Sequence, residues 1–147
     1  MLFSWLAKQL LTWVMARTRA GDIRPTLAMD HKDVRFTFPG DNSWSGTFVG
    51  KEEVRRWLER LARVGVKTFP DEVVAVGPVW NTTVSIRGHD YMRSPEGETI
   101  YENRFVIWAR LRWGRVKEYE VYEDTQKAKA LDEWLEVNER RLAAVAS

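Results

Sequence analysis

The sequence contains no cysteine among its 147 residues, and it contains only two histidines. The absence of cysteine excludes disulfide bonds, thiolate metal sites and a cysteine nucleophile. The two histidines, His31 and His89, lie in different segments and form no H-x-x-x-H motif. Metal sites built from protein side chains normally need such clustered ligands. We therefore predict no metal site and no cofactor.

Long runs of one residue type are also missing. The chain has 23 basic and 21 acidic residues, and no run of five or six basic ones, so we predict no nucleic-acid partner.

The apolar segment from Met1 to Met15 is interrupted by Lys8 and Gln9, and no small-x-small cleavage site follows it. It is shorter than the ~20 apolar residues that span a bilayer. We expect an ordinary helix here, no membrane partner and a cytoplasmic location.

The composition is that of a folded domain, with 44% hydrophobic and 30% charged residues. No linker, internal repeat or low-complexity segment divides the chain. The length suits one domain, and we predict a single domain over residues 1–147.

The first half of the sequence has helical spacing interrupted by one strand. A helical stripe runs through Leu6, Leu10, Trp13 and Val14, and Gly21 ends it. In the following segment, Asp22 is the predicted N-cap of a helix over residues 23–29. We then expect a polar turn over residues 30–33, a strand over residues 34–38 and a loop up to Gly50. A third helix follows Gly50.

After Gly65 the pattern changes to the alternation of strands. Four strands are predicted, over residues 67–76, 79–93, 99–113 and 115–124. Turn residues at 94–98 and 113–115 predict hairpins and therefore antiparallel pairing. A last helix begins at Thr125. This order of elements predicts an α+β domain.

The predicted strand that starts at Thr99 has two different faces. One face places Tyr101 and Asn103 on an otherwise apolar row, which belongs against a core or a pocket. The opposite face has Val106 and Trp108 surrounded by arginines, a composition typical of a protein interface. We therefore expect a homodimer that Trp108→Glu would weaken.

Two further features bear on a site. The eight tryptophans are more than a domain of this size needs to fill its core, which predicts that several line a cavity. His89, Asp90 and Tyr91 could form an acid–base group, but they approach a hairpin turn, so we expect them to be exposed.

Several segments, taken in their order along the chain, resemble the SnoaL-like branch of the NTF2-like superfamily. This superfamily also includes ketosteroid isomerases and limonene epoxide hydrolases. They are A-G-D at 20–22, the strand end V-R-F-T-F-P-G at 34–40, G-T-F-V-G-K-E at 46–52, Y-E-N-R at 101–104, and the segments G-R-V at 114–116 and Y-E-D at 122–124. The resemblance implies a cone-shaped, strongly curved antiparallel sheet packed on N-terminal helices, with a C-terminal helix.

The chain departs from both of these enzyme patterns. Phe38 stands where the resemblance to ketosteroid isomerases would place the general base, and Val14 where it would place a tyrosine. The strand segment 81–85 lacks the Arg-x-Asp that the resemblance to limonene epoxide hydrolases requires. We therefore predict neither of those activities.

A different set of polar residues remains on the faces predicted to point inward. The resemblance to SnoaL-type cyclases implies an acidic catalytic residue near the last strand, which is Glu123 or Asp124 here. Asp124 could instead cap the following helix, and the alternation leaves the direction of both side chains open. The predicted ligand-binding residues are Phe36, Phe38, Trp80, Tyr101, Asn103 and Tyr119.

These residues give three hypotheses for function. The first is an enzyme that transfers a proton at carbon on a hydrophobic ligand, polycyclic ones included. The second is a binding or carrier module with the same pocket and no chemistry. The third is a dimeric scaffold subunit.

Overall fold

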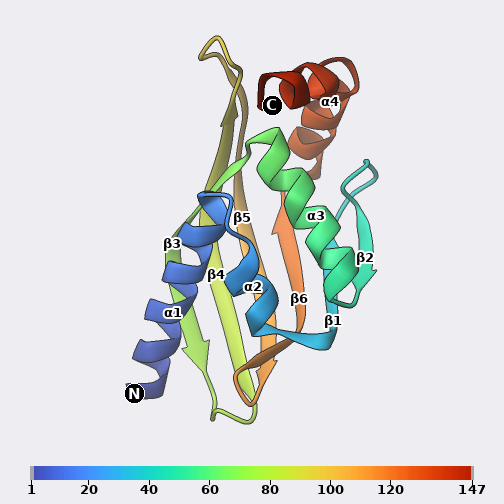
Figure 1. Ribbon diagram of the computed structural model, residues 1–147. Coiled ribbons are helices and arrows are strands. Elements are labelled where there is room, and N and C mark those ends of the chain that lie inside the picture. Colours follow the sequence, from blue (N-terminus) through green and yellow to red (C-terminus); the bar gives the residue numbers. More distant parts are fainter. Residues whose placement is uncertain (1, 147) are drawn as a thin grey trace.

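The computed structural model in Figure 1 describes residues 2–146, so Met1 and Ser147 of the predicted domain lie outside the described residues. Its elements follow in this order: α1 (Leu2–Arg19), α2 (Arg24–Met29), β1 (Asp30–Phe38), β2 (Gly46–Val49), α3 (Lys51–Val64), β3 (Lys67–Val76), β4 (Thr82–Arg93), β5 (Thr99–Arg112), β6 (Arg115–Glu123) and α4 (Thr125–Ala146).

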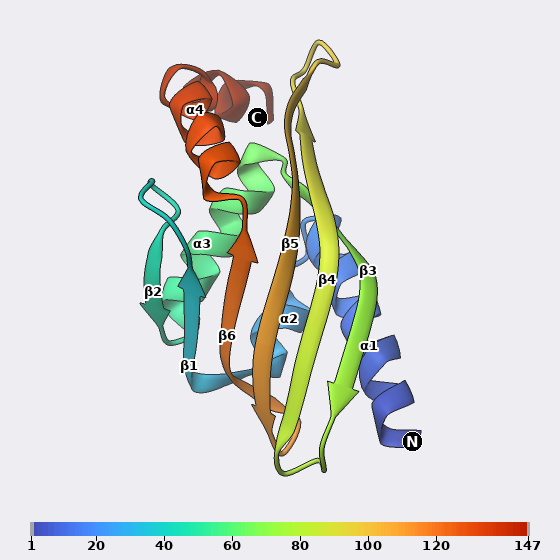
Figure 2. The ribbon, with the colours of Figure 1, turned by 180° about the vertical axis from the view of Figure 1, so that it is seen from behind.

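The six strands form one sheet in the order β2-β1-β6-β5-β4-β3. Neighbouring strands are antiparallel except β1 and β6, which pair in parallel. Helices α1, α2 and α3 cover one face of this sheet, and the view from behind shows the other face uncovered along most of its length (Figures 1 and 2). The predicted α+β architecture is confirmed.

Two segments predicted as turn and loop are strands instead. Asp30 pairs with Val116 of β6, so the predicted polar turn over residues 30–33 is the first part of β1. Phe48 pairs with Phe36, which makes residues 46–49 the edge strand β2. The polar residues Asp30 to Asp33 hid the start of β1, and β2 is a short edge strand whose side chains are mostly exposed.

The N-cap prediction for the second helix was wrong by one residue. Ile23 is the N-cap of α2, and no side chain caps it. Asp22 lies one residue earlier, where its carboxylate accepts a hydrogen bond from the backbone N–H of Arg24. It also forms ion pairs with Arg17 and Arg24, which hold the pKa of its carboxyl well below the usual range.

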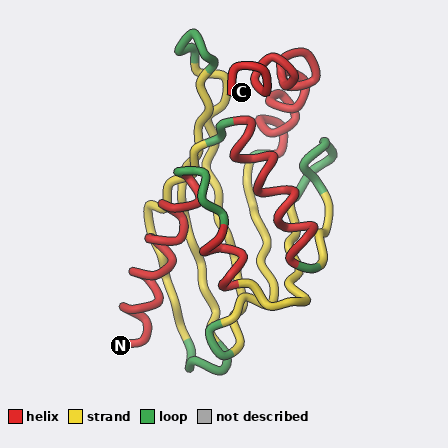
Figure 3. Tube along the Cα trace, in the orientation of Figure 1, coloured by secondary structure: helices red, strands yellow, loops and turns green. Residues whose placement is uncertain are grey.

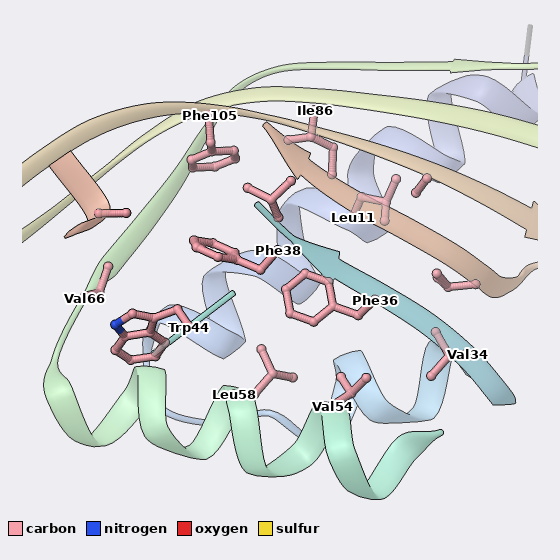
Figure 4. Packing of buried hydrophobic residues seen from close by; sticks show 14 of the residues in the cluster. Leu11, Val34, Phe36, Phe38, Trp44, Val54, Leu58, Val66, Ile86 and Phe105 are labelled. Atoms are coloured by element: carbon pink, nitrogen blue, oxygen red, sulfur yellow. The ribbon is translucent and has the colours of Figure 1, made fainter. Parts of the chain in front are cut away.

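The core lies between the sheet and the helices, as Figure 4 shows for Phe36, Phe38 and Phe105 above α3. The Phe36 ring stacks on Tyr119 at 4.5 Å between centroids and meets Trp57 edge-on at 4.8 Å. Such aromatic pairs add about 0.5–1.5 kcal/mol each beyond the area they bury. This cluster fixes β1, β6 and α3 relative to one another.

Gly88 of β4 allows the packing of Phe105. A Cβ atom at position 88 would lie 2.2 Å from the Phe69 carbonyl oxygen and 2.5 Å from the Phe105 ring. No real side chain tolerates contacts this short. The glycine therefore lets the Phe105 ring lie across β4, where it forms part of the cavity wall described below.

The two predicted faces of the strand from Thr99 are confirmed. On β5, Tyr101, Asn103 and Phe105 are buried, whereas Val106 on the opposite face is 36% exposed. The homodimer expected on that outer face stays a prediction. In the described part of the chain no helix is both long and apolar enough to cross a membrane.

Candidate functional site

A cavity of about 160 Å³ lies between the concave face of the sheet and the helices. Each of α1, α2, α3 and α4 contributes residues to its wall. Figure 3 shows the first three helices along the sheet and the C-terminal helix at its upper end. Aromatic and aliphatic side chains make most of its surface, among them Met15, Phe36, Phe38, Trp44, Trp57, Leu61, Phe105, Tyr119 and Leu131.

Three polar side chains from three adjacent strands enter this apolar cavity. They are Asp90 of β4, Tyr101 of β5 and Glu123 of β6. The Tyr101 hydroxyl donates a hydrogen bond to Glu123 Oε1 at 3.3 Å. Strands β4, β5 and β6 are neighbours in the sheet, and this places the two carboxyl groups on either side of the tyrosine.

Asn103 holds the tyrosine hydroxyl in place. Its Nδ2 donates to the Tyr101 hydroxyl oxygen at 3.0 Å and to the backbone carbonyl of Asp124 at 3.0 Å. The tyrosine oxygen therefore accepts from Asn103, and its own hydrogen is directed toward Glu123. Asn103 is 5% exposed, so water does not compete for these bonds.

The two carboxyl groups differ in proton affinity. Burial raises the pKa of Glu123 to about 8, and the nearby charge of Asp90 adds to this effect while the Tyr101 hydrogen bond opposes it. Burial also raises the pKa of Asp90 to about 6, and the charge of His89 opposes the rise. Near neutral pH the pair therefore carries about one proton, with the higher affinity at Glu123.

Three polar atoms of cavity residues have no hydrogen-bond partner among the described residues. They are Asp90 Oδ1, Trp44 Nε1 and the Tyr119 hydroxyl oxygen. A buried polar atom without a partner costs about 1–3 kcal/mol. The cavity therefore offers unpaired donors and acceptors inside an otherwise apolar wall.

A second acid lies close to Tyr119 but outside the cavity wall. Asp30 is 2% exposed, and its Oδ2 atom has no partner among the described residues. Burial raises its pKa to about 7, with the charge of Lys51 opposing the rise. Burial and then the Asp30 charge raise the pKa of the Tyr119 hydroxyl well above its usual value.

The comparisons with known proteins identify the fold. No family model and no curated protein matches the sequence. Among solved structures, an NTF2-like protein of unknown function from Burkholderia pseudomallei is 22% identical with a TM-score of 0.71, over 85% of this chain and 95% of that one. TerC, co-crystallised with polyporic acid, is 25% identical with a TM-score of 0.70, over 85% and 96% of the two chains. PrhC from Penicillium brasilianum is 14% identical with a TM-score of 0.70, over 92% and 89%.

The chain has the NTF2-like fold. The fold implied by the resemblance in the sequence is confirmed by these structures, one of which comes from a protein described as NTF2-like. A further similar structure, from Xanthomonas campestris, is described as having a cystatin-like fold.

Five of the predicted site residues meet at the cavity of this NTF2-like chain, namely Phe36, Phe38, Tyr101, Tyr119 and Glu123. Asn103 lies one step behind them and contacts Tyr101. The direction of the last two acids, which the sequence leaves open, is now defined. Glu123 enters the cavity, whereas Asp124 Oδ1 accepts from the backbone N–H groups of Gln126 and Lys127 as a cap of α4.

The placement of Trp80 in the pocket wall was wrong. Trp80 precedes β4 in a turn, is 55% exposed and lies against Trp113 with ring centroids 6.1 Å apart. The predicted strand began at Val79, but a turn closed by the Asn81 N–H to the Pro78 carbonyl delays β4 until Thr82. The side chain therefore lies outside the sheet and away from the cavity.

The expectation that Asp90 is exposed was also wrong. Asp90 is 7% exposed and lines the cavity. Its neighbour His89 points the other way and contacts the Asp71 carboxylate at 2.9 Å. The alternation of β4 carries this signal, because Ile86, Gly88, Asp90 and Met92 share the inner face. The tryptophans that line the cavity are Trp44 and Trp57.

Proposed function

We propose that the chain binds a small apolar molecule with a carbonyl oxygen in this cavity and transfers a proton at the carbon next to that oxygen. One observation carries the proposal. Two carboxyl groups, the buried Asp90 and the half-buried Glu123, face the same apolar cavity with pKa values of about 6 and 8. Environments that push two carboxyl pKa values apart are typical of acid–base pairs.

The protonation states assign the roles. Near pH 7 Asp90 is mostly ionised and serves as the base, taking a proton from carbon while the bonding electrons move to the carbonyl oxygen. Glu123 is mostly protonated and, with the Tyr101 hydroxyl beside it, stabilises the charge that develops on that oxygen. The proton returns to a carbon of the same molecule, so no other reactant is consumed. The sequence offered Glu123 or Asp124 as the catalytic acidic residue; in this scheme Glu123 holds the proton and the base is Asp90.

The size of the cavity limits the ligand. A cavity of roughly 150 Å³ is enough to hold benzene, and this one has about 160 Å³. A molecule with one ring therefore suits the cavity as it stands, while a polycyclic ligand needs wall side chains to move. TerC, which shares the fold, was co-crystallised with polyporic acid, and this supports the choice of a small organic ligand.

The test is deuterium uptake from heavy water at the carbon next to the carbonyl of small cyclic ketones, followed by proton NMR. Wild type should exchange that hydrogen faster than buffer, and Asp90→Asn should reduce the rate by roughly 10²–10⁴-fold. Glu123→Gln should also reduce it while keeping ligand binding, which a shift in melting temperature reports. Glu72→Gln, at an exposed acid that pairs with Arg87, is the matched control.

The same experiment separates the alternative hypotheses. If ligands stabilise wild type but no deuterium exchange is seen, the protein is a binding or carrier module and not an enzyme. Absence of both stabilisation and exchange over a broad set of one-ring ketones and phenols would contradict the proposal and favour the scaffold hypothesis.

A further inference from the structure

Helix α1 has an apolar face on both sides. Its inner side places Leu11 and Val14 in buried positions against the rest of the protein. Its outer side exposes five large apolar residues, between 46% and 72% each: Leu2, Trp5, Leu6, Leu10 and Trp13. Scattered exposed apolar residues are ordinary, but a contiguous group on one helix face indicates an interaction surface.

A second exposed aromatic group adjoins this face. The turn between β5 and β6 presents Trp113, which is 73% exposed and lies beside Trp80 with the two rings tilted by 45°. Its backbone has a φ of 51°, which is rare for a bulky residue. Leu10 and Trp13 of α1 line one surface depression together with Gly114 and Arg115 of this turn. Figures 1 and 2 show the N-terminus at the same end as the turn.

The charge of these segments has one sign. Residues 1–21 contain Lys8, Arg17 and Arg19 and no acid, and residues 103–117 contain five basic residues and no acid. In the turn itself, Arg112 and Arg115 flank the exposed tryptophan. Acids next to these segments pair with two of the basic residues, Asp22 with Arg17 and Glu118 with Arg110. Lys8, Arg112 and Arg115 form no ion pair among the described residues and carry the positive charge of this surface.

A second copy of the chain fits this surface poorly. A two-fold contact between α1 helices would place positive segments against each other without an acid from residues 1–21 to pair with them. An anionic lipid surface satisfies both features, since a helix lying in the interface uses leucine and tryptophan on one face with basic residues around them.

We propose that the outer face of α1, together with the Arg112–Arg115 turn, binds an anionic membrane surface. The helix lies in the plane of the interface, with Trp5, Trp13 and Trp113 at the depth of the headgroups, where tryptophan is favoured. The sequence favoured an ordinary helix over a membrane-surface role for this segment and predicted no membrane partner, because Lys8 and Gln9 interrupt its apolar run. The proposal does not depend on the function proposed for the cavity.

The test is co-sedimentation of the full chain with vesicles of phosphatidylcholine alone and of phosphatidylcholine mixed with phosphatidylserine. Binding should be roughly tenfold stronger or more to the anionic vesicles, should weaken with added salt, and should shift tryptophan emission to the blue. Leu6→Glu/Leu10→Glu should abolish it, and Lys8→Glu/Arg112→Glu should remove the preference for anionic vesicles. Val137→Glu, at an 82% exposed apolar residue of α4, is the matched control and should bind as wild type does.

Three outcomes would overturn the proposal. One is absence of wild-type binding to either vesicle. Another is equal binding by wild type and Leu6→Glu/Leu10→Glu. The third is a self-associating wild type, shown by sedimentation velocity, that the double variant converts to a monomer without any vesicle binding, since the face would then serve a second copy.

Discussion

The protein buries an acid near a tyrosine at two places, Glu123 near Tyr101 and Asp30 near Tyr119, and the two surroundings differ. Tyr101 donates to Glu123 and accepts from Asn103, so each polar group at the first place has a defined partner. At the second place Asp30 Oδ2 and the Tyr119 hydroxyl both lack a partner among the described residues. Burial raises the pKa of both acids, to about 8 for Glu123 and about 7 for Asp30.

The difference shows that a raised pKa alone does not indicate a functional acid. Glu123 opens onto the cavity and has a second carboxyl, Asp90, on the same wall. Asp30 does not line that cavity, although Tyr119 does. Structural burial also perturbs pKa values, and only geometry separates the two cases. We therefore assign the chemistry to Glu123 and Asp90 and treat Asp30 as a buried acid that costs stability when it ionises.

The largest effect that would test this contrast is the pH dependence of stability at Asp30. Its pKa rises from 3.8 to about 7 on folding, so the folded state binds the proton more tightly than the unfolded state. The associated stability is fully present below pH ~4 and is lost as the pH rises through ~7. Asp30→Asn should remove roughly 2–4 kcal/mol of this pH dependence, measured by urea unfolding between pH 4 and 8.

The control for this experiment is Asp41→Asn, which changes an exposed acid in the loop between β1 and β2. It should retain the wild-type slope of the unfolding free energy against pH. A slope for Asp30→Asn parallel to that of wild type would mean that Asp30 ionises in the folded protein as easily as in the unfolded chain. Asp30 would then not be a buried acid with a raised pKa, and its comparison with Glu123 would fail.

A smaller effect separates the two tyrosines. Because the Tyr101 hydrogen bond lowers the pKa of Glu123, Tyr101→Phe should raise that pKa above about 8, by about one unit. Tyr119→Phe should leave the Glu123 pKa unchanged, since its hydroxyl makes no bond to that acid. The measurement is the carbon-13 chemical shift of the glutamate carboxyl against pH. Equal shifts in both variants would show that the hydrogen bond is not the cause.

Sequence periodicity was enough to predict most of the fold. The strand β3 has the predicted bounds, Lys67–Val76, and β5 ends one residue earlier than predicted, at Arg112. These strands have long, regular alternation because one face packs on the helices. The short edge strand β2 was missed, because four residues with one partly buried side chain carry almost no pattern.

The site was predictable only in part. Phe36, Phe38 and Tyr101 follow from the inward faces of their strands, and strand alternation cannot by itself decide between Glu123 and Asp124. The alternation of β4 places Asp90 on the inner face, but the burial of that position depends on a distant segment. Ala128 and Leu131 of α4 line the same cavity, so a helix from the end of the chain covers a position near a hairpin turn. Contacts between residues this far apart in sequence leave no local signal.

The smallest effect tests the contrast between the adjacent acids Glu123 and Asp124. Asp124 Oδ1 accepts from the Gln126 N–H at 3.0 Å and the Lys127 N–H at 3.4 Å, which is the geometry of a helix cap. Asp124→Ala should therefore cost about 1 kcal/mol of unfolding free energy, and Asp124→Asn less than about 0.5 kcal/mol, because asparagine caps equally well. Both variants should keep the deuterium exchange that Glu123→Gln reduces. Loss of exchange in Asp124→Asn with unchanged stability would place the second functional acid at position 124 and not at 123.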